Sequence, residues 1–425
     1  MIKKFNKIEK VKGTLFLPGD KSISHRAVMF SCLANSKSVI HNCLLSADVQ
    51  STMKCFRTLG CEINIKGKTI EIIGKGFKGF AKPQIELDAG NSGTTTRLIT
   101  GILAAQNFQS TIIGDESLSK RPMLRVSEPL TKMGAKITTA ENGTLPMTIY
   151  PVEMLQPIEY ELNIPSAQIK SAILLAGLHI DEITTVIEPV ATRNHTETML
   201  NLITAEVGYG KKIFVSKKNY PVCNEYFVPS DISTAAFFIV LTLFLKNSEL
   251  RIKNILLNET RAGIIVVLKR MGARISIENE RLSSGEKVGD IIVRSSDLQN
   301  IEIEKEIIPN IIDEIPILSV AGLFADGKFE IRNVKELRVK ETDRISAVCN
   351  NMKKLGINVE EFEDGFSLDG EIKHLNNQFE SYGDHRIAMT FSVLSLLLDG
   401  QNKVNGFGCV DVSNPEFLNQ LSSII

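Results

Sequence analysis

The chain has 425 residues, of which 43% are hydrophobic and 23% charged, as in ordinary globular proteins. Its 49 basic residues balance 49 acidic ones, so no overall charge attracts nucleic acid or anionic lipid. Tryptophan is absent and aromatic residues make up only 6%, which argues against stacking platforms for single-stranded nucleic acid. We therefore expect neither a nucleic-acid partner nor a membrane partner.

No motif indicates a bound cofactor. The seven cysteines form no Cys-x-x-Cys pair, and their odd number indicates reduced, mostly buried thiols in a cytoplasmic protein. No His, Cys or Asp cluster has zinc or calcium spacing, and there is no P-loop or dinucleotide-binding glycine motif. The start of the chain lacks the apolar region of a signal peptide. The most apolar run, residues 235–245, is too short to cross a membrane and predicts a buried helix.

Taken in order, a similar pattern recurs six times, at intervals of about 65–80 residues. Each copy opens with a polar turn and an apolar helix, continues through a strand, and closes with an amphipathic helix that usually ends near a glycine. The openings lie at residues 20–26, 90–93, 165–168, 229–231, 312–314 and 383–386. The closing helices have their apolar positions within 49–56, 126–133, 200–207, 264–271, 348–355 and 417–421.

Six copies in a chain too long for one core predict two lobes of three copies each. The extended passage at residues 227–229 separates the third copy from the fourth. Before the first copy, the alternating residues 14–17 form a spare strand that could complete either lobe. The predicted lobes are residues 19–227, and residues 1–18 with 228–425, with hinges near 18–20 and 227–230. A repeat of this kind could also be a scaffold without chemistry.

The copy openings are rich in cations. In residues 19–26 a turn with three possible helix caps, Asp20, Ser22 and Ser24, is accompanied by Lys21 and Arg26. A cation at a helix start costs roughly 0.3–1 kcal/mol, and a bound anion offsets that cost. Any one of these cations could be an ordinary solvated residue. As a set they indicate a receptor for phosphate or carboxylate, the other members being Arg97, Arg121, Lys340, Arg344 and Arg386.

Two carboxylates are candidates for acid–base chemistry. Asp313 lies among isoleucines that could desolvate it, and Glu341 lies between Lys340 and a Thr-Asp-Arg run. Asp313 could instead cap the apolar helix that follows it. His385 follows a capping Asp384 and precedes Arg386, and it could hydrogen-bond or carry a proton.

Five stretches, in order along nearly the whole chain, resemble the 5-enolpyruvylshikimate-3-phosphate (EPSP) synthase family; they are residues 18–26, 90–97, 120–123, 337–344 and 384–389. The resemblance implies an α/β fold of two lobes, each of three βαβαββ repeats with helices inward. It also implies a monomer that needs no cofactor and acts in aromatic amino acid biosynthesis. The implied reaction transfers the enolpyruvyl group of phosphoenolpyruvate to the 5-hydroxyl of shikimate 3-phosphate and releases phosphate.

By position, the resemblance also implies the site residues. Shikimate 3-phosphate would be bound by Lys21, Ser22, Arg26, Ser166, Gln168, Arg193, Asp313 and Lys340. Phosphoenolpyruvate would be bound by Lys21, the Gly93 N–H, Arg121, Gln168, Arg344 and Arg386. Asp313 would accept the 5-hydroxyl proton and Glu341 would handle the proton at C3, with Lys21 and His385 nearby.

The chain departs from the family pattern in two places. Ala167 stands where many members have a second serine, and no lysine occurs near residues 411–413 to contact phosphate. The runs 94–97 and 193–195 resemble the branch of this herbicide target that tolerates glyphosate; ordinary micromolar inhibition in a steady-state assay would refute that hypothesis. The sister transferase acting on UDP-N-acetylglucosamine is an alternative, but the loop 116–122 lacks its reactive cysteine.

Overall fold

The computed structural model describes residues 1–425, which divide into two units. We call Gly19–Val228 with Ser283–Glu286 the first lobe. The second lobe consists of Met1–Pro18, Pro229–Leu282 and Lys287–Ile425. The chain therefore passes from one unit to the other four times, after residues 18, 228, 282 and 286. The last two of these crossings, on either side of residues 283–286, lie at the tip of one long hairpin. The repeat pattern of the sequence did not predict them.

Three four-stranded sheets of one design form the outside of the first lobe. In each, taking the strands in their order across the sheet, the first runs parallel to the second, the second is antiparallel to the third, and the third is antiparallel to the fourth. The first sheet is β14 (Glu225–Phe227), β3 (Lys37–His41), β5 (Thr69–Ile73) and β4 (Glu62–Lys66). The second is β6 (Leu87–Asp88), β7 (Ser110–Ile113), β9 (Met147–Tyr150) and β8 (Lys136–Thr139). The third is β10 (Glu159–Glu161), β11 (Thr184–Glu188), β13 (Gly210–Val215) and β12 (Thr204–Val207).

The helices of the first lobe fall into two sets. The inner set, α1 (Lys21–Leu33), α3 (Gly93–Leu103) and α5 (Ala167–Gly177), is buried along most of its length. The second set consists of α2 (Ala47–Thr58), α4 (Leu124–Lys132) and the short α6 (His195–Leu200). Helices α3 and α5 pack closely, since a Cβ at Gly101 would lie 2.1 Å from the Ala172 carbonyl oxygen. Gly101 is required at this contact because no side chain fits there.

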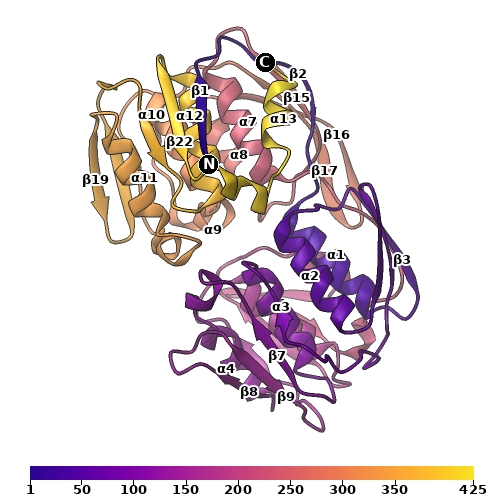
Figure 1. Cartoon of the computed structure of the whole chain (residues 1–425). Helices are drawn as coiled ribbons and strands as arrows, with labels where there is room; N and C mark the ends of the chain where they lie inside the picture. The colour runs from indigo at the N-terminus through magenta and orange to yellow at the C-terminus, as the bar shows by residue number, and fades with distance from the viewer. The chain divides into compact units, whose positions relative to one another are not determined.

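The second lobe repeats the design with modifications. Its complete sheet is β2 (Lys12–Phe16), β15 (Glu249–Leu256), β17 (Glu286–Arg294) and β16 (Arg274–Ser283), with β2 parallel to β15. A three-stranded sheet contains β18 (Phe329–Ile331), β20 (Gly365–Asp369) and β19 (Asn358–Phe362), with a single parallel bridge between Gln299 and Asp326 just before it. The last sheet is β21 (Gln378–Glu380), β22 (Gln401–Asn405) and β1 (Ile2–Asn6), and β1 lies beside β22 in Figure 1.

Three apolar helices pack together at the centre of the second lobe: α7 (Ile232–Phe244), α10 (Ile315–Phe324) and α12 (His385–Leu397) (Figure 1). The remaining helices are α8 (Gly263–Arg270), α9 (Ile308–Ile311), α11 (Arg344–Lys353) and α13 (Phe417–Ser422). The run 235–245 lies in or directly after α7, and the helix is buried on all sides up to Leu243, as predicted. No single helix is long and apolar enough to cross a membrane. The segments Lys305–Ile311 and Ile315–Phe324 reach the required length and hydropathy only when taken together, and the chain bends by 114° between them.

The predicted α/β fold and its six-copy pattern are confirmed, with three sheets in each lobe. The spare N-terminal strand belongs to the second lobe, where β2 pairs with β15 and β1 pairs with β22. In the first lobe, β14 returns from the end of the third copy to pair with β3 of the first. Each lobe is thus closed into a ring by a strand from a distant part of its sequence.

Glycines end the closing helices as predicted. Gly60, Gly134, Gly272 and Gly356 have positive φ angles of 93°, 92°, 106° and 74° just after α2, α4, α8 and α11. This left-handed conformation is the usual helix terminator, and glycine adopts it without a Cβ penalty.

The predicted helical segment over residues 200–207 is wrong. Helix α6 ends at Leu200, because Asn201 has a left-handed conformation with φ of 50°. Thr204–Val207 is instead strand β12, joined to β13 through Gly208 and Tyr209. The apolar spacing was misleading, since Ile203 is 73% exposed.

Candidate active site

At the start of helix α1, Lys21 pairs with a carboxylate of the first lobe and follows the aspartate that caps the helix. Of the three possible caps, the structure selects Asp20, whose Oδ1 accepts a hydrogen bond from the Ile23 N–H at 2.9 Å. The Lys21 Nζ donates to Asp48 Oδ2 at 3.0 Å, and Asp48 lies in the first turn of α2. These two carboxylates offset the unfavourable placement of a cation at a helix N-terminus.

Arg26 ties three helices together. Its Nε donates to Thr196 Oγ1 and its Nη2 to Ser171 Oγ, both at 2.8 Å, while its Nη1 donates to the Ser22 carbonyl at 3.1 Å. Burial lowers the pKa of Arg26 to about 10, with Glu197 opposing the shift and Arg193 adding to it. Arg26 therefore stays cationic at neutral pH, and Arg193 lies near enough for their charges to interact.

The first turn of α3 lies beneath two guanidinium groups. A Cβ at Gly93 would lie 3.4 Å from Arg121 Nη1 and 3.5 Å from Arg97 Nη1. Arg121 also donates to Asn91 Oδ1 at 2.8 Å. Backbone N–H groups at a helix start, with two cations beside them, make a suitable site for an anion.

Gln168 and Ser166 lie at the start of α5. Gln168 Oε1 accepts a hydrogen bond from Arg97, and its Nε2 donates to Thr94 Oγ1 at 3.1 Å. Ser166 is the helix cap, with its Oγ accepting from the Ile169 N–H at 3.4 Å. The Ser166 hydroxyl keeps its own proton for donation to a ligand. Arg97 joins this group although it was not among the implied ligand contacts.

A buried ion cluster supports the Arg26 contacts. Lys170 is fully buried, and its Nζ lies 2.7 Å from both Glu188 Oε1 and Glu197 Oε1. The neighbouring residues in sequence, Ser171 and Thr196, are the partners of Arg26. Sequence reasoning missed this cluster, although a lysine inside an apolar helix is rarely buried without charged partners and could have indicated it.

Replacing Lys170 with methionine should destabilise the first lobe by about 3–5 kcal/mol, because two buried carboxylates would lose their cation. Urea unfolding followed by circular dichroism measures this loss. The control is Lys212→Met, whose partner Glu159 is 59% exposed at 2.9 Å. That change should cost at most about 1 kcal/mol, so equal losses in the two variants would contradict the prediction.

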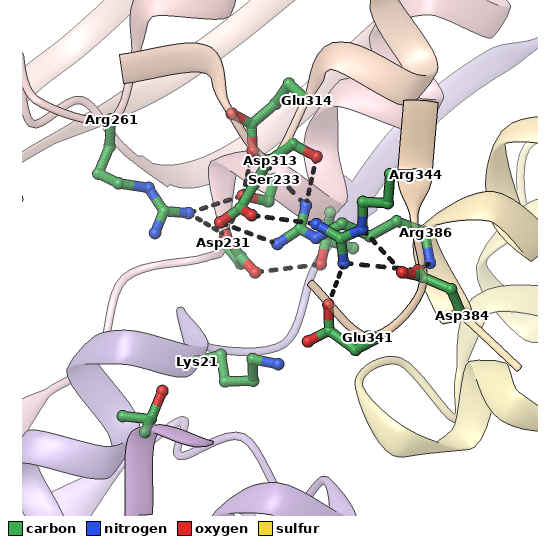
Figure 2. Close-up of polar contacts among 12 residues, drawn as sticks. Lys21, Asp231, Ser233, Arg261, Asp313, Glu314, Glu341, Arg344, Asp384 and Arg386 are labelled. Carbon is green, nitrogen blue, oxygen red and sulfur yellow. Dashed lines mark hydrogen bonds and ion pairs between the residues drawn. The ribbon is translucent and has the colours of Figure 1, made fainter. Parts of the chain in front are cut away.

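Arg344 is the centre of the cluster in the second lobe. Its Nε donates to Asp384 Oδ2 at 2.7 Å, its Nη2 to Glu341 Oε2 at 2.6 Å, and its Nη1 to Asp313 Oδ1 at 3.3 Å (Figure 2). Burial alone would lower the pKa of Arg344, but the charges of Asp384, Glu341 and Asp313 outweigh it and raise the pKa. One buried cation thus holds both candidate acid–base carboxylates.

Asp313 does not cap the helix that follows it. The cap position of α10 is Glu314, so the alternative role considered for Asp313 is wrong. The Asp313 carboxylate instead lies 3.3 Å from Arg344 and 3.6 Å from Arg386 Nη2. Its backbone carbonyl accepts a hydrogen bond from Arg386 Nη1 at 3.0 Å. The carboxylate therefore pairs with the guanidinium groups of Arg344 and Arg386.

The remaining predicted residues of this lobe lie close to the same cluster. Burial lowers the pKa of Lys340, which interacts with the charges of Asp313 and Glu341. His385 is buried in the first turn of α12. As predicted, Asp384 caps that helix, its Oδ1 accepting from the Arg386 N–H at 2.7 Å. No group of three or more His, Cys, Asp or Glu side chains could hold a metal ion.

The two lobes present different chemistry. The first gathers cations and helix N-termini, which suit the binding of phosphate and carboxylate groups. The second places two carboxylates on one buried guanidinium with a second guanidinium alongside, which suits proton transfer next to a bound anion. Together these features describe an enzyme that acts on small anionic molecules.

Solved structures and family relationships agree with this description. The enolpyruvyl transferase NikO from Streptomyces tendae has the same fold, with a TM-score of 0.76 at 14% identity, over 100% of this chain and 97% of that chain. An EPSP synthase from Acinetobacter baumannii gives a TM-score of 0.88 at 38% identity, over 99% of this chain and 97% of that chain. The fold class is therefore that of the enolpyruvyl transferases.

Sequence relatives define the family. The model of the EPSP synthase (3-phosphoshikimate 1-carboxyvinyltransferase) family matches residues 5–421. The 3-phosphoshikimate 1-carboxyvinyltransferase of Petrotoga mobilis is 47% identical over 415 residues, and that of Thermoanaerobacter sp. strain X514 is 45% identical over 408 residues, each alignment covering 96% of both chains. The chain belongs to the EPSP synthase family. The predicted family is confirmed, and the UDP-N-acetylglucosamine transferase and scaffold alternatives are not favoured.

Proposed function

We propose that this chain transfers the enolpyruvyl group of phosphoenolpyruvate to the 5-hydroxyl of shikimate 3-phosphate, acting as a monomer. The observation that carries the proposal is the pair of carboxylates, Asp313 and Glu341, held by the buried Arg344 in a member of this family. An anion receptor alone would need no such pair.

Shikimate 3-phosphate is assigned mainly to the first lobe. Arg26, with Arg193 near it, supplies positive charge, and Ser22, Ser166 and Gln168 supply polar contacts at helix starts. Lys21 contributes an ammonium group from the first turn of α1. From the second lobe, Lys340 adds a charge and Asp313 contacts the reacting hydroxyl. Preorganised donors of this kind bind a phosphate without reorganising when it arrives.

Phosphoenolpyruvate carries a phosphate and a carboxylate, and the structure offers guanidinium groups for both. Arg121 and the Gly93 N–H, with Lys21 and Gln168, suit one anionic group, and Arg344 with Arg386 suits the other. Arg344 holds three carboxylates. When a substrate anion binds to the Arg344 guanidinium, it displaces Asp313 or Glu341 from that ion pair, and the displaced side chain can then take part in proton transfer.

The reaction then proceeds with balanced proton transfers. Glu341, in its protonated form, donates a proton to C3 of the enol while the 5-hydroxyl oxygen bonds to C2 and loses its proton to the ionised Asp313. The resulting tetrahedral ketal breaks its C2–O bond to phosphate, which takes up the proton held by Asp313 as it leaves, and C3 returns its proton to Glu341. Lys21 and His385 stabilise charge near these atoms. Each carboxylate thus acts at a different atom of the substrates.

A coupled assay for phosphate release tests this function. Release should require both phosphoenolpyruvate and shikimate 3-phosphate. Release with UDP-N-acetylglucosamine in place of shikimate 3-phosphate would identify the sister activity. If no phosphate were released with any acceptor, the chain would be a scaffold without catalytic activity.

Replacing Lys21 with methionine should lower the affinity for each substrate by roughly 10- to 100-fold, because a hydrogen bond from a charged group contributes about 1.5–3 kcal/mol. Isothermal titration of each ligand measures the two affinities. Lys120→Met is the control, since Lys120 pairs only with the 87% exposed Glu116. Unchanged affinity for either substrate would show that Lys21 does not serve both.

A further inference from the structure

A second polar network adjoins the Arg344 cluster and involves none of the residues assigned above to substrates. Ser233 Oγ donates a hydrogen bond to Glu314 Oε1, and Arg261 Nη2 donates to Ser233 Oγ at 2.7 Å. The same Arg261 nitrogen lies 3.2 Å from Asp231 Oδ1. Figure 2 shows these side chains converging beside Asp313. The starts of α7 and α10 and the loop before α8 are joined in this way.

All four residues are almost completely buried. The exposed fractions are 7% for Asp231, 2% for Ser233, 3% for Arg261 and 2% for Glu314. Buried charges are costly unless they are paired and hydrogen-bonded, so an isolated carboxylate at position 314 would not persist here. Ser233 donates a hydrogen bond to the Glu314 carboxylate, and Arg261 in turn donates to Ser233, so the carboxylate has a fixed partner inside the lobe.

Glu314 connects this network to the candidate active site. Its Oε1 lies 3.6 Å from Arg386 Nη1, and the same nitrogen donates to the Asp313 carbonyl at 3.0 Å. The Arg386 guanidinium is therefore held on one side by Glu314 and on the other by the Asp313 carboxylate. A planar guanidinium held by two carboxylates has little freedom to rotate.

We propose that Glu314, fixed by Ser233 and Arg261, is a positioning residue that orients Arg386 for phosphoenolpyruvate. The role rests on the proposed function, in which Arg386 binds that substrate. Glu314 touches no substrate and acts only through Arg386. It should therefore matter for phosphoenolpyruvate and not for shikimate 3-phosphate, whose contacts lie mainly in the first lobe.

The test uses the full chain with Glu314→Gln, which preserves the size of the side chain and a hydrogen bond with Ser233 but removes the charge. We expect the KM for phosphoenolpyruvate to rise roughly tenfold, since misplaced binding groups are costly, while kcat changes by less than about threefold. The KM for shikimate 3-phosphate and the Tm should stay at wild-type values. Glu304→Gln is the matched control, because Glu304 is a half-exposed surface partner of Arg270. The control should change none of these quantities.

Ser233→Ala provides a second, independent variant. It should raise the same KM by a smaller factor, because Glu314 loses its nearest donor. The double variant should be no worse than Glu314→Gln alone, since both changes act on one chain of contacts. Additive effects of the two changes would overturn the proposed connection.

Each remaining outcome separates the two levels of the proposal. A wild-type chain without substrate-dependent phosphate release would overturn the proposed function, and the positioning role with it. An active wild type whose KM for phosphoenolpyruvate is unchanged in Glu314→Gln and in Ser233→Ala would overturn the positioning role alone. Equal rises of both KM values with a lowered Tm would show that Glu314 is merely structural, and would also overturn it.

Discussion

Replacing Asp313 with alanine should lower kcat by about 10²–10⁴-fold, the usual contribution of a positioned general base. Affinity for the substrates should fall far less, because the proton acceptor acts in the transition state. Since Glu314, not Asp313, occupies the cap position of α10, the substitution removes no helix cap. Steady-state kinetics give kcat, and isothermal titration with shikimate 3-phosphate gives the affinity.

The control for Asp313 is Asp399→Ala, a second-lobe aspartate that is 69% exposed and paired with Lys7. This variant should keep wild-type kinetics. Equal losses of kcat and substrate affinity in Asp313→Ala would contradict a role as base. Full activity in Asp313→Asn would contradict it as well, because asparagine cannot accept the proton.

Replacing Arg344 with methionine should destabilise the second lobe by about 3–5 kcal/mol, because three carboxylates lose their shared buried cation. Phosphoenolpyruvate binding should also be lost, since the variant removes one of the two guanidinium groups assigned to it. Arg344→Lys should recover only part of the stability, as one ammonium group cannot bridge three carboxylates in this geometry. Urea unfolding and calorimetric titration measure the two effects.

Arg332→Met is the matched control for Arg344. Arg332 is 46% exposed and pairs with Asp364 at 3.0 Å, so its removal should cost less than about 1 kcal/mol. If Arg344→Met unfolded at the same urea concentration as the wild type, the prediction would be contradicted. Other groups would then have to balance the negative charge of the three carboxylates. Unchanged affinity for phosphoenolpyruvate would show that Arg344 does not bind this substrate.

The candidate site could be predicted as far as its residues occur in contiguous motifs. Lys21 and Arg26 lie five positions apart, at and just after one helix start, and Asp384 and Arg386 are two positions apart at another. Local sequence places such residues within the first two turns of a helix, whatever the rest of the chain does. Their partners were not predictable in this way. Thr196 is 170 positions from Arg26, and Glu188 is 18 positions from Lys170.

The sequence by itself determined the six-copy pattern, because helix periodicity, caps and terminal glycines act over a few neighbouring residues. The glycines at positions 134, 272 and 356 end their helices for this local reason. Only the tertiary structure decided that Glu314 bonds to Ser233, 81 positions away, and that Asp313 is left to Arg344 and Arg386. It also decided which distant strands close each lobe. Such contacts form only when the repeats pack together, so they cannot be predicted from the local sequence pattern.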